Sequence, residues 1–393
     1  LYVKILKMTK IVFYTLGCKA NQYQTDILKS QLLTNDAQLT TFGAEADLYV
    51  INTCTVTEDA DRKSKQAIRR ALRLGKRVMV SGCYSKLKSN ELKTLFPAIE
   101  IKNVDFLASP SFFDCRVRAN LMIQDGCDHF CSYCIVPYAR GKTRSKPIEE
   151  VINEARQLVS TGAKEIVLTG INLATYQPDL SLVIKRLSSL EGLLRIRLSS
   201  LEPMYLSKNL IDTIADTPKV CHHLHLPLQS GDNEILKAMN RNYTREDYLE
   251  LIHYLRKKIP DCGITTDIIV GFPGEGEKEF QNTVDLIRQV KFSRMHIFTY
   301  SQRAKTPAAN FPKQVREEIK KERSKILHKL REKYMIEFAH RYYNNEVEIL
   351  VEKVGEGLTS NYIRVTYPGK ISEVGKLKKV KLLNNFKDNI SEK

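Results

Sequence analysis

Three cysteines carry the most distinctive chemistry in this sequence. Cys127, Cys131 and Cys134 lie within residues 126–134 in the spacing Cys-x3-Cys-x2-Cys. Thiolates are soft ligands that favour iron–sulfur clusters or zinc over hard cations. Three thiolates can hold three irons of a four-iron cluster and leave the fourth iron open to another ligand. The loop therefore predicts an iron–sulfur centre with one free coordination position.

Two other interpretations of this loop remain open from the spacing alone. A structural zinc site needs four protein ligands, and His129 in the same loop is an alternative fourth ligand. In the second interpretation the three cysteines are unrelated to one another and are simply buried, because free cysteine packs as a small hydrophobic residue.

A second set of three cysteines follows predicted strands in the first third of the chain. These strands cover residues 10–16, 48–52 and 77–81. Helical patterns lie between them at residues 21–34 and 58–74, and this alternation predicts an open parallel α/β sheet. Cys18, Cys54 and Cys83 come directly after the strands, where ligands gather on such sheets. We therefore expect a second iron–sulfur site there. For Cys115, Cys221 and Cys262 we expect packing roles.

The middle of the chain repeats a strand-and-helix pattern. Six strands are predicted at residues 120–124, 165–169, 194–199, 222–226, 264–270 and 294–299. Six repeats are fewer than the eight of a closed barrel, so we expect a partial (βα)6 barrel with its chemistry at the carboxyl ends of the strands. The cysteine loop directly follows the first of these strands. His222, His223 and His225 lie on the fourth strand, and we interpret them as packing residues, with a metal site as the alternative.

The last part of the chain changes its pattern twice. Apolar residues recur at helical spacing from Val315 to Phe338 in a Lys/Glu-rich stretch, which predicts a long amphipathic helix. From residue 345 the alternation has period two, and glycines separate short strands, which predicts a small β-barrel. The fold class is therefore α/β, with an N-terminal open parallel sheet, a central partial barrel and a C-terminal small β-barrel. The expected boundaries are residues 9–118, 119–312, 313–344 and 345–393.

Charge points to a polyanionic partner. The chain has 62 Lys and Arg against 45 Asp and Glu, a formal net charge of +17 and a pI near 9.3. RNA or DNA fits such a surface best, and a generic basic surface is the alternative. The candidates for nucleic-acid contact are Arg69, Arg70, Arg140, Arg144, Arg364 and Lys379.

Cellular location follows from what the sequence lacks. Its apolar runs are shorter than a membrane span, and residues 1–8 do not form a convincing secretory signal. We expect a cytoplasmic protein, in which nine cysteines indicate metal or redox chemistry rather than disulfides. Met8 is a candidate translation start, in which case residues 1–7 precede the native chain.

These motifs together resemble one enzyme family. The Cys-x3-Cys-x2-Cys loop, with Tyr133 before its last cysteine, resembles that of radical S-adenosylmethionine (SAM) enzymes. Residues 15–22, 51–57 and 82–84 resemble the N-terminal domain of the methylthiotransferases in that group. The terminal β module resembles the TRAM domain, which binds RNA. Residues 13–19 and 131–141 look closest to the branch that modifies threonylcarbamoyladenosine in tRNA.

The resemblance implies specific cofactors and ligands. Cys127, Cys131 and Cys134 would hold a 4Fe-4S cluster that cleaves SAM to methionine and a 5′-deoxyadenosyl radical. Cys18, Cys54 and Cys83 would hold an auxiliary 4Fe-4S cluster that carries the sulfur to be transferred. SAM would serve both as radical source and as methyl donor. The implied SAM-contacting residues are Tyr133, Thr169, Gly170, Glu202 and Gln229. No further catalytic residue is assigned.

The implied reaction is methylthiolation of carbon 2 of N6-threonylcarbamoyladenosine at position 37 of tRNA. The alternatives are the same chemistry on N6-isopentenyladenosine or on a ribosomal protein residue. A non-enzymatic metal-containing RNA-binding protein is an alternative of another class. The implied partners are a tRNA anticodon stem-loop and a low-potential electron donor such as flavodoxin or ferredoxin, and we expect a monomer. Because both clusters must lie close to the adenine, we expect the carboxyl edge of the N-terminal sheet to face the barrel mouth.

Overall fold

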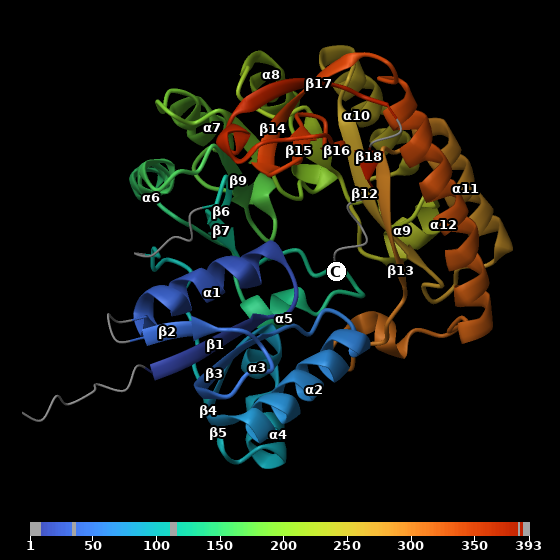
Figure 1. The fold of residues 1–393 in the computed structure, drawn as a ribbon. Coiled ribbons are helices and arrows are strands. Elements are labelled where there is room, and N and C mark those ends of the chain that lie inside the picture. Colours follow the sequence, from blue (N-terminus) through green and yellow to red (C-terminus); the bar gives the residue numbers. More distant parts are fainter. Residues whose placement is uncertain (1–8, 34–36, 111–115, 384–385, 388–393) are drawn as a thin grey trace, which may run out of the picture.

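The computed structural model describes residues 9–33, 37–110, 116–383 and 386–387. The candidate start Met8, the residues before it and Cys115 lie outside the described residues. The chain forms an N-terminal sheet with its helices, a central partial barrel, a long helix and a C-terminal sheet (Figure 1). The domain boundaries given above stay a prediction.

The N-terminal sheet is parallel throughout and has the strand order β2-β1-β3-β4-β5. Its strands are β1 (Thr9–Thr15), β2 (Ala37–Thr40), β3 (Ala46–Thr53), β4 (Gly75–Gly82) and β5 (Ile99–Ile101). Its helices are α1 (Lys19–Leu32), α2 (Glu58–Leu74), α3 (Cys83–Leu87) and α4 (Ser89–Leu95). Sequence patterning predicted β1, β3 and β4 but not the short outer strands β2 and β5. Helix α2 begins and ends where the pattern predicted, with Thr57 accepting a hydrogen bond from the Ala60 amide as its N-cap.

Six parallel strands form the partial barrel, as the sequence predicted. They are β6 (Arg118–Met122), β9 (Glu165–Thr169), β10 (Arg195–Leu198), β11 (His223–His225), β12 (Gly263–Val270) and β13 (Arg294–Thr299). Hydrogen bonding divides them into two three-stranded sheets, β10-β9-β6 and β11-β12-β13. Isolated bridges between Ile196 and Val220 and between Ser200 and His225 connect the two halves.

Helices cover the outer face of the barrel. They are α6 (Ile148–Ser160), α7 (Leu180–Ser188), α8 (Lys208–Asp216), α9 (Asn233–Ala238), α10 (Arg245–Lys258) and α11 (Glu277–Val290). Helix α5 (Val136–Arg140) instead ends the cysteine loop and packs against α3. Short 3₁₀ turns lie at Leu173–Thr175, Pro203–Tyr205, Pro307–Asn310 and Ile371–Glu373. The strand residues that face these helices are apolar, for example Ile166, Leu198 and Leu224. Because side chains alternate along a strand, the intervening residues face the barrel lumen, and many are charged or polar.

A two-stranded ribbon supports the cysteine loop. The segment expected as one strand at residues 120–124 is divided between β6 and β7 (Gln124–Asp125). Strand β7 pairs antiparallel with β8 (Arg144–Ser145), so the two ends of the loop are held together. The loop therefore projects from a fixed base at the carboxyl end of β6.

The C-terminal part is joined to the barrel by α12 (Glu317–His340). Leu327 and Tyr334 of this helix enter the barrel core, and Phe338 enters the core of the terminal module. The module is an antiparallel sheet of order β17-β14-β15-β16-β18. Its strands are β14 (Glu346–Lys353), β15 (Glu356–Thr359), β16 (Arg364–Thr366), β17 (Leu377–Lys381) and β18 (Phe386–Lys387). This arrangement is consistent with the expected small β-barrel.

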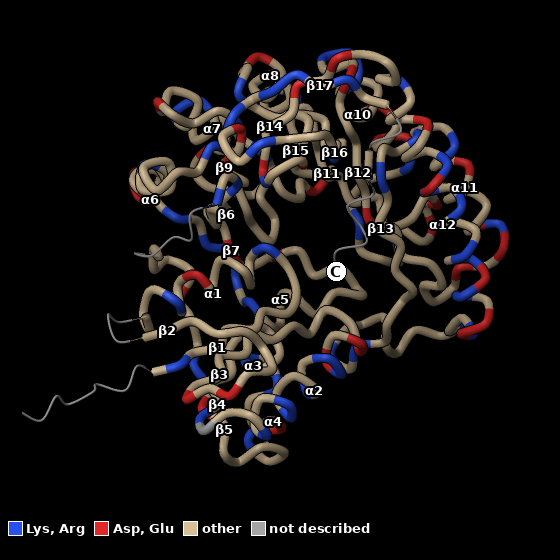
Figure 2. The backbone as a smooth tube through the Cα atoms, viewed as in Figure 1, with Lys and Arg blue, Asp and Glu red and all other residues tan. Residues whose placement is uncertain are grey.

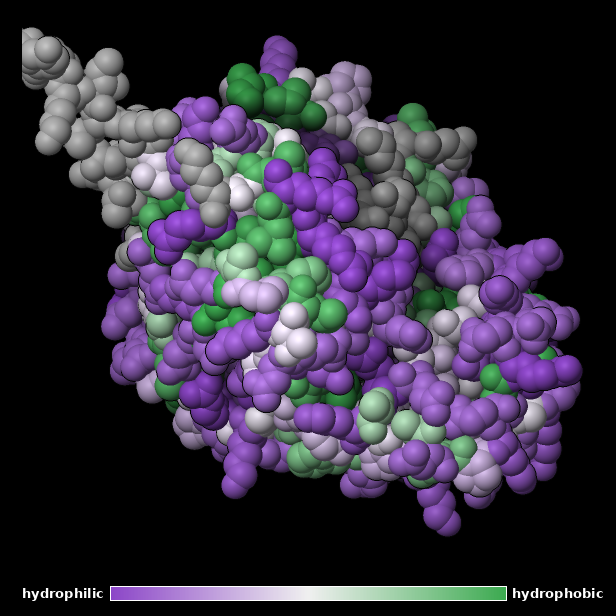
Figure 3. Space-filling view, turned by 90° about the horizontal axis from the view of Figure 1, so that it is seen from below, coloured by the Kyte–Doolittle hydropathy of each residue, from purple (hydrophilic) through white to green (hydrophobic). Residues whose placement is uncertain are grey.

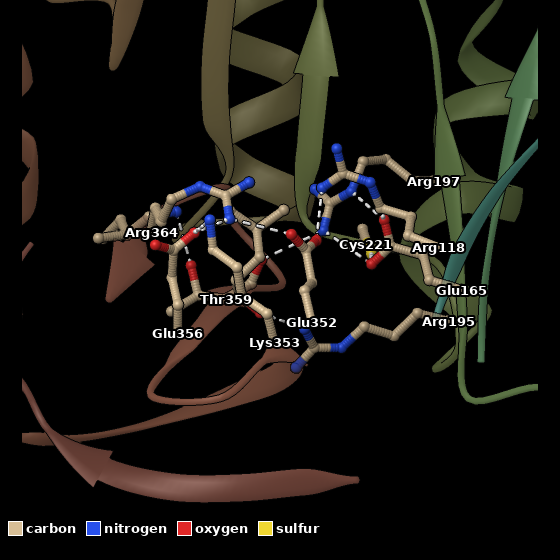
Figure 4. Close-up of polar contacts among 12 residues, drawn as sticks. Arg118, Glu165, Arg195, Arg197, Cys221, Glu352, Lys353, Glu356, Thr359 and Arg364 are labelled. Carbon is tan, nitrogen blue, oxygen red and sulfur yellow. Dashed lines mark hydrogen bonds and ion pairs between the residues drawn. The ribbon is translucent and has the colours of Figure 1, made fainter. Parts of the chain in front are cut away.

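Two arginines of β10 anchor the terminal module to the barrel (Figure 4). Arg195 donates a hydrogen bond to the Leu358 carbonyl at 2.6 Å. Arg197 donates to the Ser360 and Thr359 carbonyls at 3.0 and 3.2 Å. Glu165 binds Arg197 through both oxygens, at 2.7 and 3.2 Å, and both side chains are buried. Burial opposes ionisation of Glu165, but Arg197 holds the pKa of this carboxyl below its usual value.

The surface is predominantly charged and polar. Lys and Arg occur in every part of the fold, and Asp and Glu lie among them, most visibly along α11 and α12 (Figure 2). Seen from below, the molecule presents mostly hydrophilic residues with smaller hydrophobic areas among them (Figure 3). Within the described part of the chain, no helix has the length and apolar character required to cross a membrane.

We expect Arg197→Met to loosen the terminal module. The substitution removes two hydrogen bonds to Glu165 and two to the module, and it leaves the buried Glu165 carboxylate with Arg118 3.9 Å away as its remaining arginine, which costs about 3 kcal/mol. Backbone amides of β15 and β16 should then exchange with deuterium about 100-fold faster, as measured by mass spectrometry. The control Arg77→Met removes an exposed ion pair with Glu100 and should leave this exchange unchanged. Unchanged exchange in Arg197→Met would contradict the anchoring role.

Candidate functional site

A cavity of about 240 Å³ lies at the carboxyl ends of the barrel strands. The cysteine loop contributes Cys127, His129, Cys131, Tyr133, Cys134, Ile135 and Val136. Segments at or beyond the ends of β9 to β13 contribute Ile171, Asn172, Glu202, Gln229, Asp267, Ile269, Phe298, Thr299, Tyr300 and Ser301. Val56 and Thr57 come from the N-terminal sheet, just after Cys54. The carboxyl edge of that sheet therefore faces the barrel mouth, as we expected.

The start of the cysteine loop requires glycine. Gly126 has a φ of +77°, and a Cβ atom there would lie 2.0 Å from the Lys142 carbonyl oxygen. Any side chain would therefore collide with backbone. This close approach lets the Cys127 amide donate a hydrogen bond to the Gly141 carbonyl at 3.1 Å. The Gln124 and Asp125 side chains also bind the Gly126 carbonyl and amide, at 2.8 and 2.9 Å, so the loop entrance is fixed on both sides.

The far side of the loop is bound to α9. The Ser132 amide donates to the Met239 carbonyl at 3.0 Å, and its hydroxyl donates to the Ala238 carbonyl at 2.7 Å. The His129 ring lies 2.6 Å from the Asn240 carbonyl. These contacts hold the segment between Cys127 and Cys134 against the barrel. The three thiols are therefore presented to the cavity by a constrained loop.

The three thiols of the loop differ in how readily they ionise. Burial raises the pKa of Cys127 to about 11 and raises that of Cys134 well above its ordinary value. Burial also opposes ionisation of Cys131, but a hydrogen bond from His129 and the charge of Arg241 hold the pKa of Cys131 below its ordinary value. Arg241 Nη1 lies 3.8 Å from Cys131 Sγ. Cys131 is therefore the thiol best prepared to act as a thiolate ligand.

The thiols of this site are not arranged around a single metal ion. Among the residues that the structure describes, no three Cys, His, Asp or Glu side chains converge closely enough to hold one metal ion. In a four-iron cluster each cysteine binds a different iron, so its ligands do not need to converge on one point.

Three of the five predicted SAM residues line the cavity, namely Tyr133, Glu202 and Gln229. Glu202 lies 2.5 Å from the Arg241 guanidinium, which fixes the carboxylate at the cavity wall. Gln229 has a φ of +66°, a strained conformation that is held by backbone hydrogen bonds to Asp267 and Ile269. Such strain is common in binding sites.

The other two predicted SAM residues, Thr169 and Gly170, do not line the cavity. Thr169 is buried, and its hydroxyl donates to the Val167 carbonyl at 3.1 Å. A Cβ atom on Gly170 would lie 2.8 Å from Gln124 Oε1, so this glycine makes room for the Gln124 side chain. Their neighbour Asn172 lines the cavity instead, and its buried Oδ1 has no hydrogen-bond partner in the described structure. The unsatisfied oxygen marks Asn172 as a ligand-binding candidate.

The second set of thiols lies together at the edge of the N-terminal sheet. Cys18 caps α1 after β1, Cys54 follows β3, and Cys83 begins α3 after β4. Burial, opposed by Arg140 and assisted by the nearby Cys18 and Cys54 thiols, raises the pKa of Cys83 to about 11. A Cβ atom on Gly17 would lie 2.9 Å from the Cys54 Cβ, so the turn before Cys18 passes directly over Cys54.

Asn21 and Arg140 connect the two sets of thiols. Asn21 Nδ2 donates to the Leu16 carbonyl at 2.8 Å and to the Thr53 carbonyl at 3.0 Å. Arg140 donates to Asn21 Oδ1 at 2.7 Å and to Asp125 Oδ1 at 2.9 Å. Asp125 directly precedes the cysteine loop, and Arg140 follows it. One buried guanidinium therefore bridges the N-terminal sheet and the base of the loop.

Two of the predicted nucleic-acid residues are unavailable to a phosphate. The expectation for Arg140 is wrong, because this side chain is buried in the bridge just described. The expectation for Arg364 is also wrong, because Glu352 and Glu356 bind its guanidinium at 3.0 and 2.5 Å. Both arginines therefore serve internal contacts.

The four other basic candidates are exposed. Arg69 and Arg70 lie on α2, over the rings of Phe96 and Phe42. Arg144 is 3.2 Å from Asp105, and Lys379 lies on the outer strand β17. These side chains stay candidates for RNA contact.

Two aromatic side chains of the cysteine loop were missed by sequence reasoning. Phe130 and Tyr138 are 49% and 39% exposed, and their rings form an edge-to-face pair 5.5 Å apart. They belong to the segment that forms the cavity wall. The sequence did contain one signal for them, namely large aromatic residues beside cysteine ligands, whereas their exposure is seen only in the structure. Such a pair offers a surface on which a base can stack.

Comparison with known proteins places this geometry in context. Residues 121–287 match the Radical SAM superfamily, and residues 10–102 match Uncharacterized protein family UPF0004. The chain is 39% identical to the threonylcarbamoyladenosine tRNA methylthiotransferase MtaB of Bacillus subtilis (strain 168), over 96% of this chain and 94% of that protein.

Other similar proteins broaden the comparison. The tRNA-2-methylthio-N(6)-dimethylallyladenosine synthase of Alkaliphilus oremlandii (strain OhILAs) is 36% identical, over 96% of this chain and 91% of its own length. Among solved structures, the radical S-adenosylmethionine methyltransferase TsrM of Kitasatospora setae has a TM-score of 0.59 at 13% identity, over 77% of each chain. This structural likeness supports the fold alone.

We expect Arg140→Gln to lower the free energy of unfolding by about 3 kcal/mol, because it leaves the buried Asp125 without its charged partner. Urea denaturation of the metal-free protein measures this change. The control Arg144→Gln removes an exposed ion pair with Asp105 and should change the free energy by less than about 0.5 kcal/mol. Equal effects of the two substitutions would show that Arg140 is not a buried bridge.

Proposed function

Because this chain belongs to the tRNA methylthiotransferase family of radical SAM enzymes, we propose that it methylthiolates carbon 2 of N6-threonylcarbamoyladenosine at position 37 of tRNA. Enzymes of this family use SAM and two 4Fe-4S clusters. The observation that carries the proposal is the position of two thiol sets on either side of one bridge, formed by Asn21, Arg140 and Asp125. Two clusters held there would lie close to one substrate.

The donor atoms fit the two clusters. Cys127, Cys131 and Cys134 would hold the SAM-cleaving cluster, and the neighbouring His129 and Arg241 favour a thiolate at Cys131. Cys18, Cys54 and Cys83 would hold the auxiliary cluster. When bound, the first cluster supplies the electron that cleaves SAM, and the second supplies the sulfur. Buried thiols that raise one another's pKa are stabilised as thiolates when a metal centre binds them.

The cavity wall is suited to bind SAM and to exclude water. The carboxylate of Glu202 can accept hydrogen bonds from ribose hydroxyls, and Arg241 holds that carboxylate in place. Gln229 and the unsatisfied Asn172 Oδ1 add polar contacts. Ile135, Ile171 and Ile269 supply the apolar surface that keeps solvent away from a reactive intermediate. These residues bind and orient, whereas the bond-breaking chemistry belongs to the cofactors.

The exposed basic and aromatic residues fit a tRNA anticodon loop. Arg69, Arg70, Arg144 and Lys379 would contact phosphates, and the Phe130–Tyr138 pair would stack a base that is splayed out of the loop. A net charge of +17 favours RNA over a protein substrate. The enzyme would work in the cytoplasm as a monomer, with a low-potential electron donor such as flavodoxin or ferredoxin.

A second candidate substrate is N6-dimethylallyladenosine, which a relative of 36% identity is named for. The apolar part of the cavity wall suits such a group. The two relatives named for threonylcarbamoyladenosine are 39% and 38% identical to this chain, which favours the first substrate.

The proposed substrate makes a prediction about tRNA composition. Deleting the gene should remove 2-methylthio-N6-threonylcarbamoyladenosine from bulk tRNA, as measured by liquid chromatography and mass spectrometry of nucleosides. Expression of the intact chain should restore it, and 2-methylthio-N6-isopentenyladenosine should not change. Loss of the isopentenyl derivative instead would assign the enzyme to the second substrate.

The two proposed cluster sites make separate predictions. After anaerobic reconstitution, the intact chain should hold about eight irons and cleave SAM when reduced. Cys83→Ala should hold about four irons and still cleave SAM, whereas Cys134→Ala should hold about four and fail to cleave it. Cys262 is buried in the hydrophobic core of the barrel, so the control Cys262→Ala should keep about eight irons. An equal loss of SAM cleavage in both ligand variants would contradict the division into two sites.

A further inference from the structure

Polar side chains line the barrel lumen directly below the cavity, and we call this part of the lumen the chamber. Asp267 lines the cavity, and the His225 ring lies 3.3 Å from its carboxylate. Thr265 is two residues further down β12, about 7 Å away by strand geometry. Its hydroxyl is 2.9 Å from His225 Nδ1 and 3.1 Å from His223 Nε2. A continuous polar path therefore leads from the cavity into the lumen.

The terminal module closes the lower end of this chamber with Tyr362. The Tyr362 ring stacks on His223 with a centroid distance of 4.1 Å, and Arg197 and Arg294 lie 5.0 and 5.6 Å from it. Tyr362 has a φ of +78°, a strained conformation for a residue other than glycine. Burial opposes ionisation of the phenol, but the surrounding cations, among them Lys19, lower its pKa. The chamber floor is therefore at positive potential.

The cations of this chamber differ in whether a carboxylate pairs with them. Arg118 is 2.6 Å from Glu352, and Arg197 is bound by Glu165. Lys19 is half-buried, and its ammonium makes no hydrogen bond or ion pair with any residue that the structure describes. Burial lowers the pKa of Lys19, and Tyr362, Arg118, Arg197 and Glu165 lie near enough to act on its amine, which places that amine in the barrel lumen. A carboxylate bound beside it would favour its charged form.

Lys19 lies between the chamber and the auxiliary thiol site. Lys19 directly follows Cys18 and begins α1, so its backbone is part of the auxiliary thiol site. Helix α1 lies against the barrel, where Asn120 donates to Gln22 Oε1 at 3.1 Å and Tyr23 donates to Glu154. A base held between the two thiol sets would therefore have Lys19 beside it.

We propose that Lys19 binds the carboxylate of the threonylcarbamoyl group and selects this substrate against adenosines with an apolar N6 substituent. The inference rests on the proposed function. A carboxylate that leaves water needs a charged hydrogen-bond donor, and the unengaged ammonium of Lys19 supplies one. A dimethylallyl group has no atom that can satisfy this ammonium, so its entry would leave a desolvated charge.

The test compares binding of anticodon stem-loop RNAs to the reconstituted enzyme under anaerobic conditions. One RNA carries N6-threonylcarbamoyladenosine at position 37, a second carries the neutral amide of the same group, and a third carries adenosine. We expect the intact enzyme to bind the first about tenfold more tightly than the second, as measured by fluorescence anisotropy. Lys19→Gln should bind both with the same weaker affinity, and Lys19→Arg should restore most of the preference.

Controls separate the proposed role from others. Lys10→Gln removes an exposed charge from β1 and should keep the tenfold preference. If Lys19→Gln keeps the preference, or weakens binding of all three RNAs equally, Lys19 does not read the carboxylate; the second result would indicate a phosphate contact. If the intact enzyme methylthiolates isopentenyladenosine and not threonylcarbamoyladenosine, the proposed function fails together with the inference.

A measurement on the unaltered protein covers the case in which the Lys19 variants do not fold. Acetylation of lysines with an amine-reactive ester, followed by mass spectrometry, reports how accessible Lys19 is. The threonylcarbamoyl RNA should slow acetylation of Lys19 about tenfold relative to its amide, and Lys10 should react equally with both. Equal protection of Lys19 by the two RNAs would overturn the proposal.

Discussion

The fold depends on one buried ionic bridge, in which Arg140 connects Asp125 and Asn21. Each partner belongs to a different structural unit, since Asp125 is the base of the cysteine loop and Asn21 is on the first helix of the N-terminal sheet. Burying a guanidinium is costly, and its hydrogen bond to Asn21 is made only when both units are docked. The need of this buried guanidinium for both partners therefore favours one docked arrangement of the two groups of thiols.

The sequence was sufficient to predict the elements that carry the chemistry. Parallel strands have continuous hydrophobic runs, so β3 was recognisable, and the residues at their carboxyl ends followed from topology. The short outer strands β2 and β5 were missed because three or four partly exposed residues have little pattern. Thr169 and Gly170 do not line the cavity, since chain order gives the strand end but not which of its residues turns into the cavity.

The environment of individual charged side chains was the hardest property to predict from the sequence. Arg140 and Arg364 were expected at the surface because a sequence shows a cation but not the carboxylate beside it. The partner of Arg140 is fifteen residues earlier, across a loop closure, and those of Arg364 lie on β14 and β15. The unengaged ammonium of Lys19 was equally invisible, because its surroundings come from β6, β10 and the terminal module. Strand register and docking decide these environments.

The insertion of Tyr362 into the barrel has a consequence for protein synthesis. Residues that complete the chamber floor and satisfy Arg195 and Arg197 lie between 358 and 362, near the end of the chain. A ribosome builds the chain from its N-terminus, so the barrel strands emerge long before this segment. Until it arrives, β10 holds two arginines without their carbonyl acceptors. A prematurely terminated chain would retain the six proposed cluster ligands and all six barrel strands but would lack the segment that covers the lumen, which exposes it to proteolysis.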